Sequence, residues 1–184
     1  MGVKRDPRMP QPNDAALLAT IHAGPPEAGR EALRTLYERH AAAVHGFLVR
    51  LEPDVTLCDD LLQDCFLAAR RQAGRFREGS ARPWLLSLAA GRLRDTRRAG
   101  RRRRAREAEV ARPEAERDTE ASDLELERGM AELPERERAA LHLRYHAQLT
   151  VAEASTVLGV SPRTVKSWAA AGLARLRKRL EDDA

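Results

Sequence analysis

The chain has 184 residues, of which 42% are hydrophobic and 33% charged, so it has enough apolar residues for one domain or two small ones. Aromatic and β-branched residues are sparse, while alanine, leucine, arginine and glutamate abound, which favours helices and argues against a β-sandwich or barrel. The formal net charge is +5. Because no apolar run approaches the roughly 20 residues of a membrane span, and residues 1–13 hold no apolar signal core, we expect a cytoplasmic protein.

The sequence offers little for metal or catalytic chemistry. Cys58 and Cys65 lie seven residues apart on one predicted helix, about 10 Å from each other, which is too far for a disulfide. His142 and His146 could hold half a zinc site, but no third ligand is evident. There is no Gly-rich phosphate loop, nucleophile elbow or pair of catalytic carboxylates. We therefore predict no enzyme, no catalytic residue, no metal and no cofactor.

A first helical unit is predicted over residues 14–104, after a stretch over residues 1–13 that we expect to be disordered. One helix should run from Asp14 to the Gly-Pro-Pro break at residues 24–26. Another should span about residues 27–51, where apolar residues spaced by three and four indicate a buried helix face.

Two further helices complete this unit and carry opposite charges. One should begin near Thr56, with Asp59 three residues on as its capping-box partner. Its apolar stripe leaves four polar residues on the opposite side: Asp59, Asp60, Gln63 and Asp64. The last helix begins near Trp84 and ends in a basic run, since residues 92–104 hold eight arginines against one acid.

The charge then reverses, because residues 107–127 contain nine acids and two arginines with little to bury. This composition predicts a solvated acidic linker over residues 105–123. A second compact helical unit should follow over residues 124–184, where apolar residues return at helical spacing.

Residues 149–180 have the features of a helix-turn-helix. Thr150 and Glu153 form a capping box that opens a short helix. Gly159 stands where a left-handed residue ends that helix, and Ser161 caps a second helix with a proline at its first position. The second helix of this motif enters the major groove with its N-terminal residues nearest the bases. The predicted DNA-contacting residues of this helix are Arg163, Thr164, Lys166, Ser167 and Arg175.

Several segments in order resemble an RNA polymerase sigma factor of the extracytoplasmic-function group, over about residues 14–180. Residues 31–40 (EALRTLYERH) resemble the opening of its region 2, and residues 58–67 (CDDLLQDCFL) resemble the acidic helix of that region. Residues 84–98 resemble its promoter-melting helix with the basic tail. Residues 133–138 (LPERER) resemble the entry to region 4, and Lys166-Ser167 matches a Lys/Arg-Ser pair in the recognition helix.

The resemblance implies an all-α protein in which region 2 and region 4 are two small helical domains joined by a flexible charged linker. It implies binding to core RNA polymerase (the β′ coiled coil and the β flap), to promoter DNA and to an anti-sigma factor. The recognition-helix residues would read the −35 element. The residues implied in binding the −10 element and the DNA backbone are Arg75, Phe76, Arg77, Arg82, Trp84, Arg94, Arg97 and Arg98. The residues implied in binding core polymerase are Asp59, Asp60, Leu61, Gln63 and Asp64.

Two alternatives stay open at this stage. A stand-alone helix-turn-helix regulator has no need of a polymerase-binding unit, and it would usually dimerise. A core-binding, sigma-like protein with weakened promoter recognition is suggested by Ala169–Ala171, where the family has arginines and a bulky residue.

Overall fold

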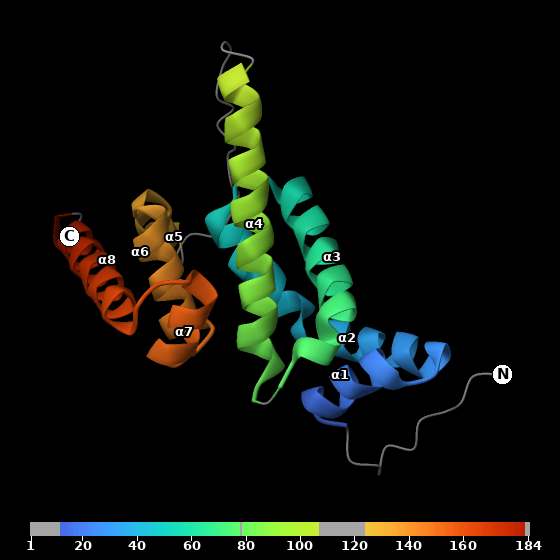
Figure 1. Ribbon diagram of the computed structural model, residues 1–184. Coiled ribbons are helices and arrows are strands. Elements are labelled where there is room, and N and C mark those ends of the chain that lie inside the picture. Colours follow the sequence, from blue (N-terminus) through green and yellow to red (C-terminus); the bar gives the residue numbers. More distant parts are fainter. Residues whose placement is uncertain (1–11, 78, 107–123, 183–184) are drawn as a thin grey trace.

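The computed structural model describes residues 12–77, 79–106 and 124–182, and every regular element within these ranges is a helix or a helical turn (Figure 1). This confirms the all-α fold expected from the sequence. The first elements are α1 (Asp14–Ala23), α2 (Pro26–Leu51), α3 (Val55–Gln72), the 3-10 turn η1 (Ala73–Arg75) and α4 (Ala81–Arg106). Then come α5 (Leu124–Glu132), α6 (Glu135–Leu141), the π-helical turn η2 (His142–His146), α7 (Val151–Leu158) and α8 (Pro162–Asp182).

The expected boundaries of the first two helices hold, whereas α3 and α4 begin earlier than predicted. Helix α4 begins at Ala81 rather than near Trp84, after Ser80, whose hydroxyl accepts a hydrogen bond from the Arg82 N–H at 3.3 Å. Of the stretch predicted to be disordered, residues 1–13, only residues 12–13 are among those that the structure describes. Of the predicted linker over residues 105–123, only residues 105–106 are described, and these belong to α4. Helix α3 begins earlier than predicted, because Asp54 rather than Thr56 caps it. The Asp54 carboxylate accepts a hydrogen bond from the Leu57 N–H at 3.0 Å. Asp59 lies further along α3, where its carboxylate is 3.2 Å from His45 Nε2.

Helices α2, α3 and α4 pack around a core that includes Phe47, Leu48 and Leu85, none of which is exposed. Both cysteines are buried in this core and form no disulfide, as their spacing predicted; the Cys65 thiol lies 3.4 Å from the Leu85 carbonyl oxygen. Helix α1 is held against α2 by Asp14, whose carboxylate lies 2.8 Å from His40 Nε2 and 3.1 Å from Arg39 Nη1. None of the helices in the described part of the chain is long and apolar enough to cross a membrane.

The C-terminal helices form the predicted helix-turn-helix, with the predicted caps. The Thr150 side chain and Glu153 make a reciprocal capping box at the start of α7. Gly159 ends α7 in the left-handed conformation, at φ 68°, which a residue with a Cβ rarely adopts. The Thr164 N–H then donates to the Ser161 hydroxyl at 3.1 Å, so α8 starts with the expected N-cap.

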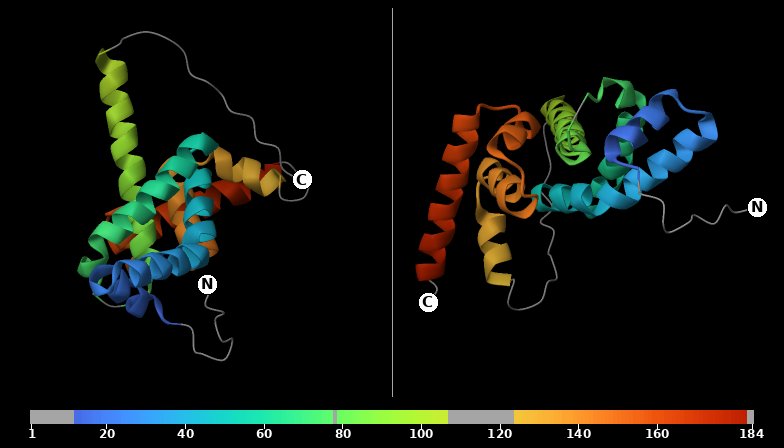
Figure 2. Two further views of the ribbon diagram at one scale, coloured as in Figure 1. Left: turned by 90° about the vertical axis from the view of Figure 1, so that its right-hand side faces the viewer. Right: turned by 90° about the horizontal axis from the view of Figure 1, so that it is seen from below.

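The two halves of the described chain share one apolar core. Helix α7 packs on α4, and α6 and η2 pack on α2, so the buried cluster of the first helices continues through Leu143 to Val157 and Val165. The views from two further directions place α7 beside α4 (Figure 2). Helix α4 continues beyond this contact and projects from the body (Figure 1).

Two polar residues near the start of the C-terminal unit, His142 and Glu137, are buried. His142 is 2% exposed and lies between Phe47 of α2 and His146, with ring centroids 5.8 and 4.7 Å away. Burial, aided by the positive charge of Arg50, lowers the pKa of His142 to about 3. Glu137 is 3% exposed, and its Oε2 lies 3.0 Å from Arg175 Nε.

Acid should destabilise the folded chain through His142. Because its pKa falls from 6.5 to about 3 on folding, the unfolded chain binds the proton first, and stability declines as the pH drops below about 6.5. At pH 5 the free energy of unfolding should be about 2 kcal/mol lower on this account. Urea unfolding at pH 7.5 and pH 5 measures the difference. The drop should shrink in His142→Leu and persist in His22→Leu, the exposed control. An equal drop in His142→Leu would contradict the burial of a neutral histidine.

Arg175 should contribute to stability through Glu137. Arg175→Ala leaves a buried carboxylate without its cation, and we expect the free energy of unfolding to fall by about 1–3 kcal/mol. Lys178→Ala, three residues on at an exposed position, is the matched control and should change stability by less than about 0.5 kcal/mol. Thermal unfolding followed by circular dichroism compares the two variants. Equal melting temperatures for both would show that the Glu137 carboxylate needs no partner.

Candidate functional site

Helix α8 presents a continuous solvent-exposed stripe, which we call the outer face of α8. At 100° per residue its members project from one side of the helix, while Val165, Ala169 and Leu176 on the other side are buried. The members are Arg163, Lys166, Ser167, Ala170, Ala174, Arg177 and Lys178. The capped N-terminal turn thus carries two cations and a hydroxyl with free access to solvent.

The structure places the five residues predicted for DNA contact on α8 in three different surroundings: the outer face, the N-cap and the side that faces α6. Arg163, Lys166 and Ser167 lie on the outer face. Thr164 is half-buried, and its hydroxyl lies 2.8 Å from that of Ser161, so it belongs to the cap. Arg175 projects to the side of α6, where its guanidinium meets the buried Glu137, so it is not on the outer face. The charge pattern alone could not distinguish these places.

Two alanines also belong to the outer face. Ala170 is part of the run Ala169–Ala171 that suggested weakened promoter recognition, whereas Ala174 was not singled out from the sequence. Both are exposed between the basic residues of the first and last turns, and their small side chains leave the middle of the face narrow. Counting along the sequence from Arg163 in steps of three and four residues would have placed both alanines on this face. A narrow exposed stripe with cations at both ends suits close approach to a nucleic-acid groove.

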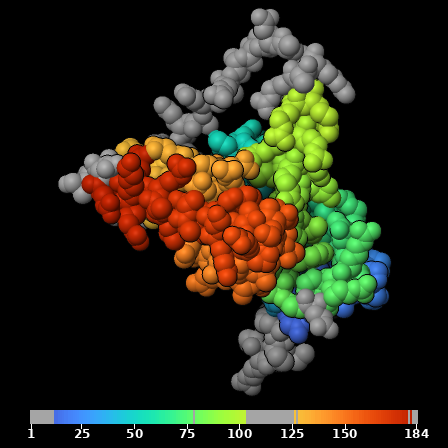
Figure 3. Space-filling view, turned by 60° about the vertical axis from the view of Figure 1, so that its left-hand side comes forward, coloured from blue at the N-terminus to red at the C-terminus, as the bar shows by residue number. Residues whose placement is uncertain are grey.

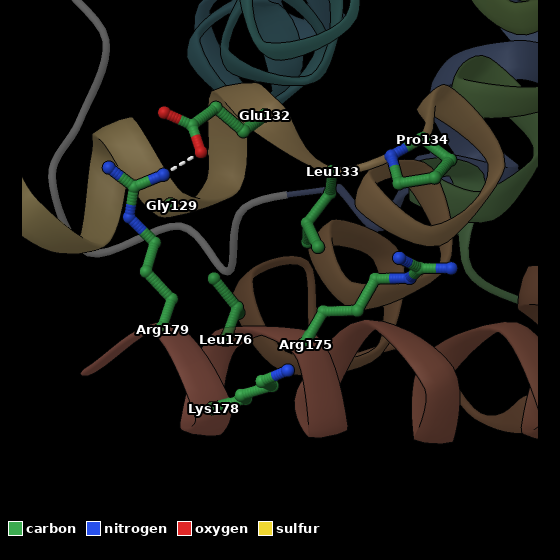
Figure 4. A pocket seen from close by; sticks show the side chains of 8 residues that line it. All are labelled: Gly129, Glu132, Leu133, Pro134, Arg175, Leu176, Lys178 and Arg179. Carbon is green, nitrogen blue, oxygen red and sulfur yellow. Dashed lines mark ion pairs between the residues drawn. The ribbon is translucent and has the colours of Figure 1, made fainter. Parts of the chain in front are cut away.

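A groove of about 520 Å³ lies between α5 and α8, on another side of α8 (Figure 4). Leu133 and Leu176 point into it, and Arg179 reaches across from α8 to pair with Glu132 of α5. Its remaining lining residues are Gly129, Pro134, Arg175 and Lys178. The groove is therefore bridged by an ion pair, with cations from α8 along one wall.

Helix α3 carries the predicted acidic side chains on one exposed side. Asp59, Asp60, Gln63 and Asp64 are all exposed there, and we call them the acidic face of α3. Leu61 is 2% exposed and belongs to the core, so it cannot be part of a binding surface; the apolar stripe of α3 passes through it.

An exposed leucine completes the acidic face. Leu67 is 42% exposed and follows Asp60 by seven residues, which places it on the same side of α3. Leu67 was not among the predicted site residues, although its seven-residue spacing from Asp60 indicated that both lie on the same side of the helix. An apolar side chain among carboxylates suits a protein surface with basic and apolar groups better than it suits DNA, whose phosphates repel acids.

The predicted aromatic pair before α4 is a packed unit. The rings of Phe76 and Trp84 meet edge to face with centroids 5.4 Å apart, and both side chains are half-buried against the core. The arginines on either side of Phe76, Arg75 and Arg77, are exposed, while Arg82 is half-buried. Phosphates could therefore approach this loop through Arg75 and Arg77.

Helix α4 carries a basic side along its C-terminal half. Arg94, Arg98 and Arg101 are exposed and follow one another by four and three residues, so they form one stripe. Arg97 lies beside this stripe but is engaged: its guanidinium is 3.2 Å from Glu52 Oε2 and also pairs with Glu135 of α6. The predicted DNA-backbone residues of α4 thus differ in their surroundings. Arg98 is exposed, Arg94 is exposed and donates to the Leu158 carbonyl oxygen at 2.9 Å, and Arg97 is held by acids.

Two models of known protein families match separate parts of the chain. The family model for Sigma-70 region 2 matches residues 36–103, which span most of α2 through most of α4. The family model for Sigma-70, region 4, matches residues 123–176, which include the helix-turn-helix.

Curated relatives match most of the chain. RNA polymerase sigma factor CarQ of Myxococcus xanthus is 32% identical over 163 residues, which cover 84% of this chain and 92% of CarQ. The ECF RNA polymerase sigma factor SigM of Mycobacterium tuberculosis is 32% identical over 171 residues, covering 91% of this chain and 85% of SigM.

Two solved structures share the fold. The sigma factor RpoE of Bartonella quintana, crystallised with the anti-sigma factor NepR, superposes with a TM-score of 0.69 at 19% identity, covering 82% of this chain and 98% of that one. CnrH in complex with the cytosolic domain of CnrY gives a TM-score of 0.65 at 25% identity, covering 93% of this chain and 99% of that one. With both sigma regions in order on a helix-turn-helix framework, the chain belongs to the extracytoplasmic-function group of RNA polymerase sigma factors.

Proposed function

We propose that this chain carries core RNA polymerase to promoters by means of three surfaces: the outer face of α8, the basic stripe of α4 and the acidic face of α3. The observation that carries the proposal is the outer face of α8, where Arg163, Lys166 and Ser167 stand exposed on the capped first turn of a helix-turn-helix. In this motif that turn meets base edges in the major groove. The element read there is the −35 element.

The second contact with DNA is made by α4 and the loop before it. Arg94 and Arg98 on α4, with Arg75 and Arg77 near the Phe76–Trp84 pair, offer cations to the phosphate backbone around the −10 element. Phosphate contacts of this kind position a protein on DNA without reading its sequence. Promoter selection would therefore depend on α8, whereas α4 would retain the opened DNA.

The third contact is with polymerase, through the acidic face of α3. Its carboxylates and the exposed Leu67 suit a basic surface with apolar groups, such as the β′ coiled coil. The β flap is the expected partner of the C-terminal unit. The chain has no reaction of its own in this scheme, because the chemistry of RNA synthesis belongs to the polymerase.

The proposal places the chain in the cytoplasm, where core polymerase and DNA are found, and includes an anti-sigma partner. The support for that partner is the fold shared with the sigma factor RpoE, whose co-crystal structure contains the anti-sigma factor NepR, and with CnrH, whose structure is in complex with the cytosolic domain of CnrY. An anti-sigma factor would act by covering one of the three surfaces.

Run-off transcription tests the whole proposal. Purified chain and core polymerase are incubated with promoter fragments from the source genome, and transcripts should start at defined sites only when the chain is present. Tight, sequence-specific DNA binding without polymerase, together with no new transcript, would instead favour a stand-alone regulator. Polymerase binding without a defined start would favour a core-binding protein with weakened promoter recognition.

Lys166→Glu should weaken recognition of the −35 element and leave polymerase binding intact. It replaces a cation on the first turn of α8 with an anion, and loss of one base or phosphate contact costs about 1–3 kcal/mol. Arg128→Glu makes the same charge change on α5, away from the outer face. It shows how much of any loss in DNA affinity comes from the lower net charge alone. Promoter binding by the reconstituted holoenzyme is the measurement. The same affinity in Lys166→Glu and Arg128→Glu would remove Lys166 from the DNA interface.

Asp60→Arg should abolish polymerase binding while the protein stays folded. It sets a cation against a basic docking surface, and like charges across an interface cost several kcal/mol, or about a thousandfold in affinity near 4 kcal/mol. The matched control is Glu27→Arg, an equal charge change on the first turn of α2. Pull-down of core polymerase should fail for Asp60→Arg and succeed for Glu27→Arg. If Asp60→Arg still binds polymerase, the docking face lies elsewhere.

A further inference from the structure

We infer that α1 positions the basic loop, residues 75–77, for DNA: the His22 ring of α1 packs on Gly74 and holds the loop in the conformation that meets the −10 element. The family model for region 2 matches residues 36–103, so α1 lies outside that match. The inference rests on the proposed contact between the basic loop and DNA. It adds a positioning residue, which acts through the loop.

His22 and Gly74 make a close contact between α1 and η1. A Cβ built on Gly74 would lie 2.5 Å from Cε1 of the imidazole and 2.7 Å from both Nδ1 and Nε2. These distances are far below van der Waals contact, so a side chain at residue 74 would displace the ring. The three distances are also nearly equal, which places the face of the ring over the glycine. Only a glycine leaves room for the ring at this place.

Helix α1 is fixed to the body, so the ring has a firm base. Leu17 and Leu18 are buried in the core of the first helices. The start of α1 is bound to α2 through Asp14, and at its end the Gly24 N–H donates to the Thr20 carbonyl oxygen at 2.8 Å. A ring in the last turn of a helix that is fixed in this way can hold a neighbouring turn in place.

The basic loop is also held by the core and by α4. Ala73 is 4% exposed, and the Phe76 N–H donates to its carbonyl oxygen at 3.1 Å. The Phe76 ring meets Trp84 of α4 edge to face. With the His22 contact, the backbone is fixed on both sides of Arg75, whose side chain stays exposed to solvent.

The contact matters because the turn it covers is weak by itself. A 3-10 turn of three residues has poor hydrogen-bond geometry, and glycine is the residue with the greatest backbone freedom. Helix α1 and η1 meet at the surface, where the blue residues of the first helices border the green ones that precede α4 (Figure 3). A loop that is ordered before DNA arrives loses less conformational entropy on binding, so its arginines bind phosphates more tightly.

Amide hydrogen exchange tests the contact in the full-length chain without DNA. His22→Ala removes the ring, and Gly74→Ala drives it away with a Cβ. Each should raise the exchange rate over residues 73–77 by about threefold or more, because the uncovered turn opens more often. The double variant should exchange no faster than the faster single variant, since both changes break the same contact. The control Gly29→Ala adds the same methyl group to α2, where the Cβ meets nothing nearer than 3.6 Å, and should leave the rate unchanged.

DNA binding by the holoenzyme tests the positioning role. The probe is a promoter fragment with a defined start in run-off transcription, mismatched over its −10 region so that it is already open. Holoenzyme with His22→Ala or Gly74→Ala should bind it at least about fivefold more weakly than holoenzyme with Gly29→Ala. Pull-down of core polymerase should be equal for all three variants, because the acidic face of α3 is untouched.

His22→Phe separates positioning from direct contact with DNA. It keeps a flat ring over Gly74 and lacks the nitrogens that could bind a phosphate, so both exchange and affinity should return to within about twofold of the parent chain.

Parent exchange rates over residues 73–77 in both His22→Ala and Gly74→Ala would overturn the contact. Faster exchange with unchanged affinity would overturn the positioning role, and so would slow exchange without recovered affinity in His22→Phe. If the parent holoenzyme starts no transcript, the proposed function fails, while the exchange rates still decide whether His22 holds the loop.

Discussion

The packing of α7 against α4 determines where the charged surfaces of this protein lie relative to one another. It joins the apolar core of the first helices to that of the helix-turn-helix through Leu143, Val157 and Val165. Because the contact uses the side of α7 that carries Ala154 and Val157, the outer face of α8 remains exposed. The acidic face of α3 lies on a different helix of the first unit. Cationic and anionic surfaces therefore stay apart in a chain in which 33% of residues are charged.

That separation matters because a sigma factor has partners of opposite character. DNA phosphates attract arginines at long range, whereas the acidic face would repel them. With Asp60 and Asp64 on α3, and the exposed arginines on α4 and α8, the surfaces proposed for polymerase and for DNA lie on different helices and would not interfere with each other. The ion pair of Glu137 and Arg175 has a different effect, since it sets an exposed arginine of α8 against a buried carboxylate and turns its guanidinium toward α6.

Features that depend on a few neighbouring residues could be predicted from the sequence. Thr150, Gly159 and Ser161 cap or end their helices as expected, since capping needs only local hydrogen bonds and one permitted backbone conformation. The places of Arg97 and Arg175 could not be predicted in this way, because the acids that hold them lie far away in sequence or on another helix. Charge patterns count arginines, but tertiary contacts decide which ones remain free. For these reasons the helices were predicted more accurately than the site.

Tertiary contacts also decide which arginines of α4 a phosphate would meet directly. Arg97 is held by Glu52 Oε2 at 3.2 Å and by Glu135, and the exposed Arg94 donates to the Leu158 carbonyl oxygen at 2.9 Å. Arg98 and Arg101 are exposed on the same helix. A phosphate that approaches α4 would therefore reach Arg98 and Arg101 directly, whereas at Arg94 and Arg97 it would compete with protein acceptors for the same guanidinium group.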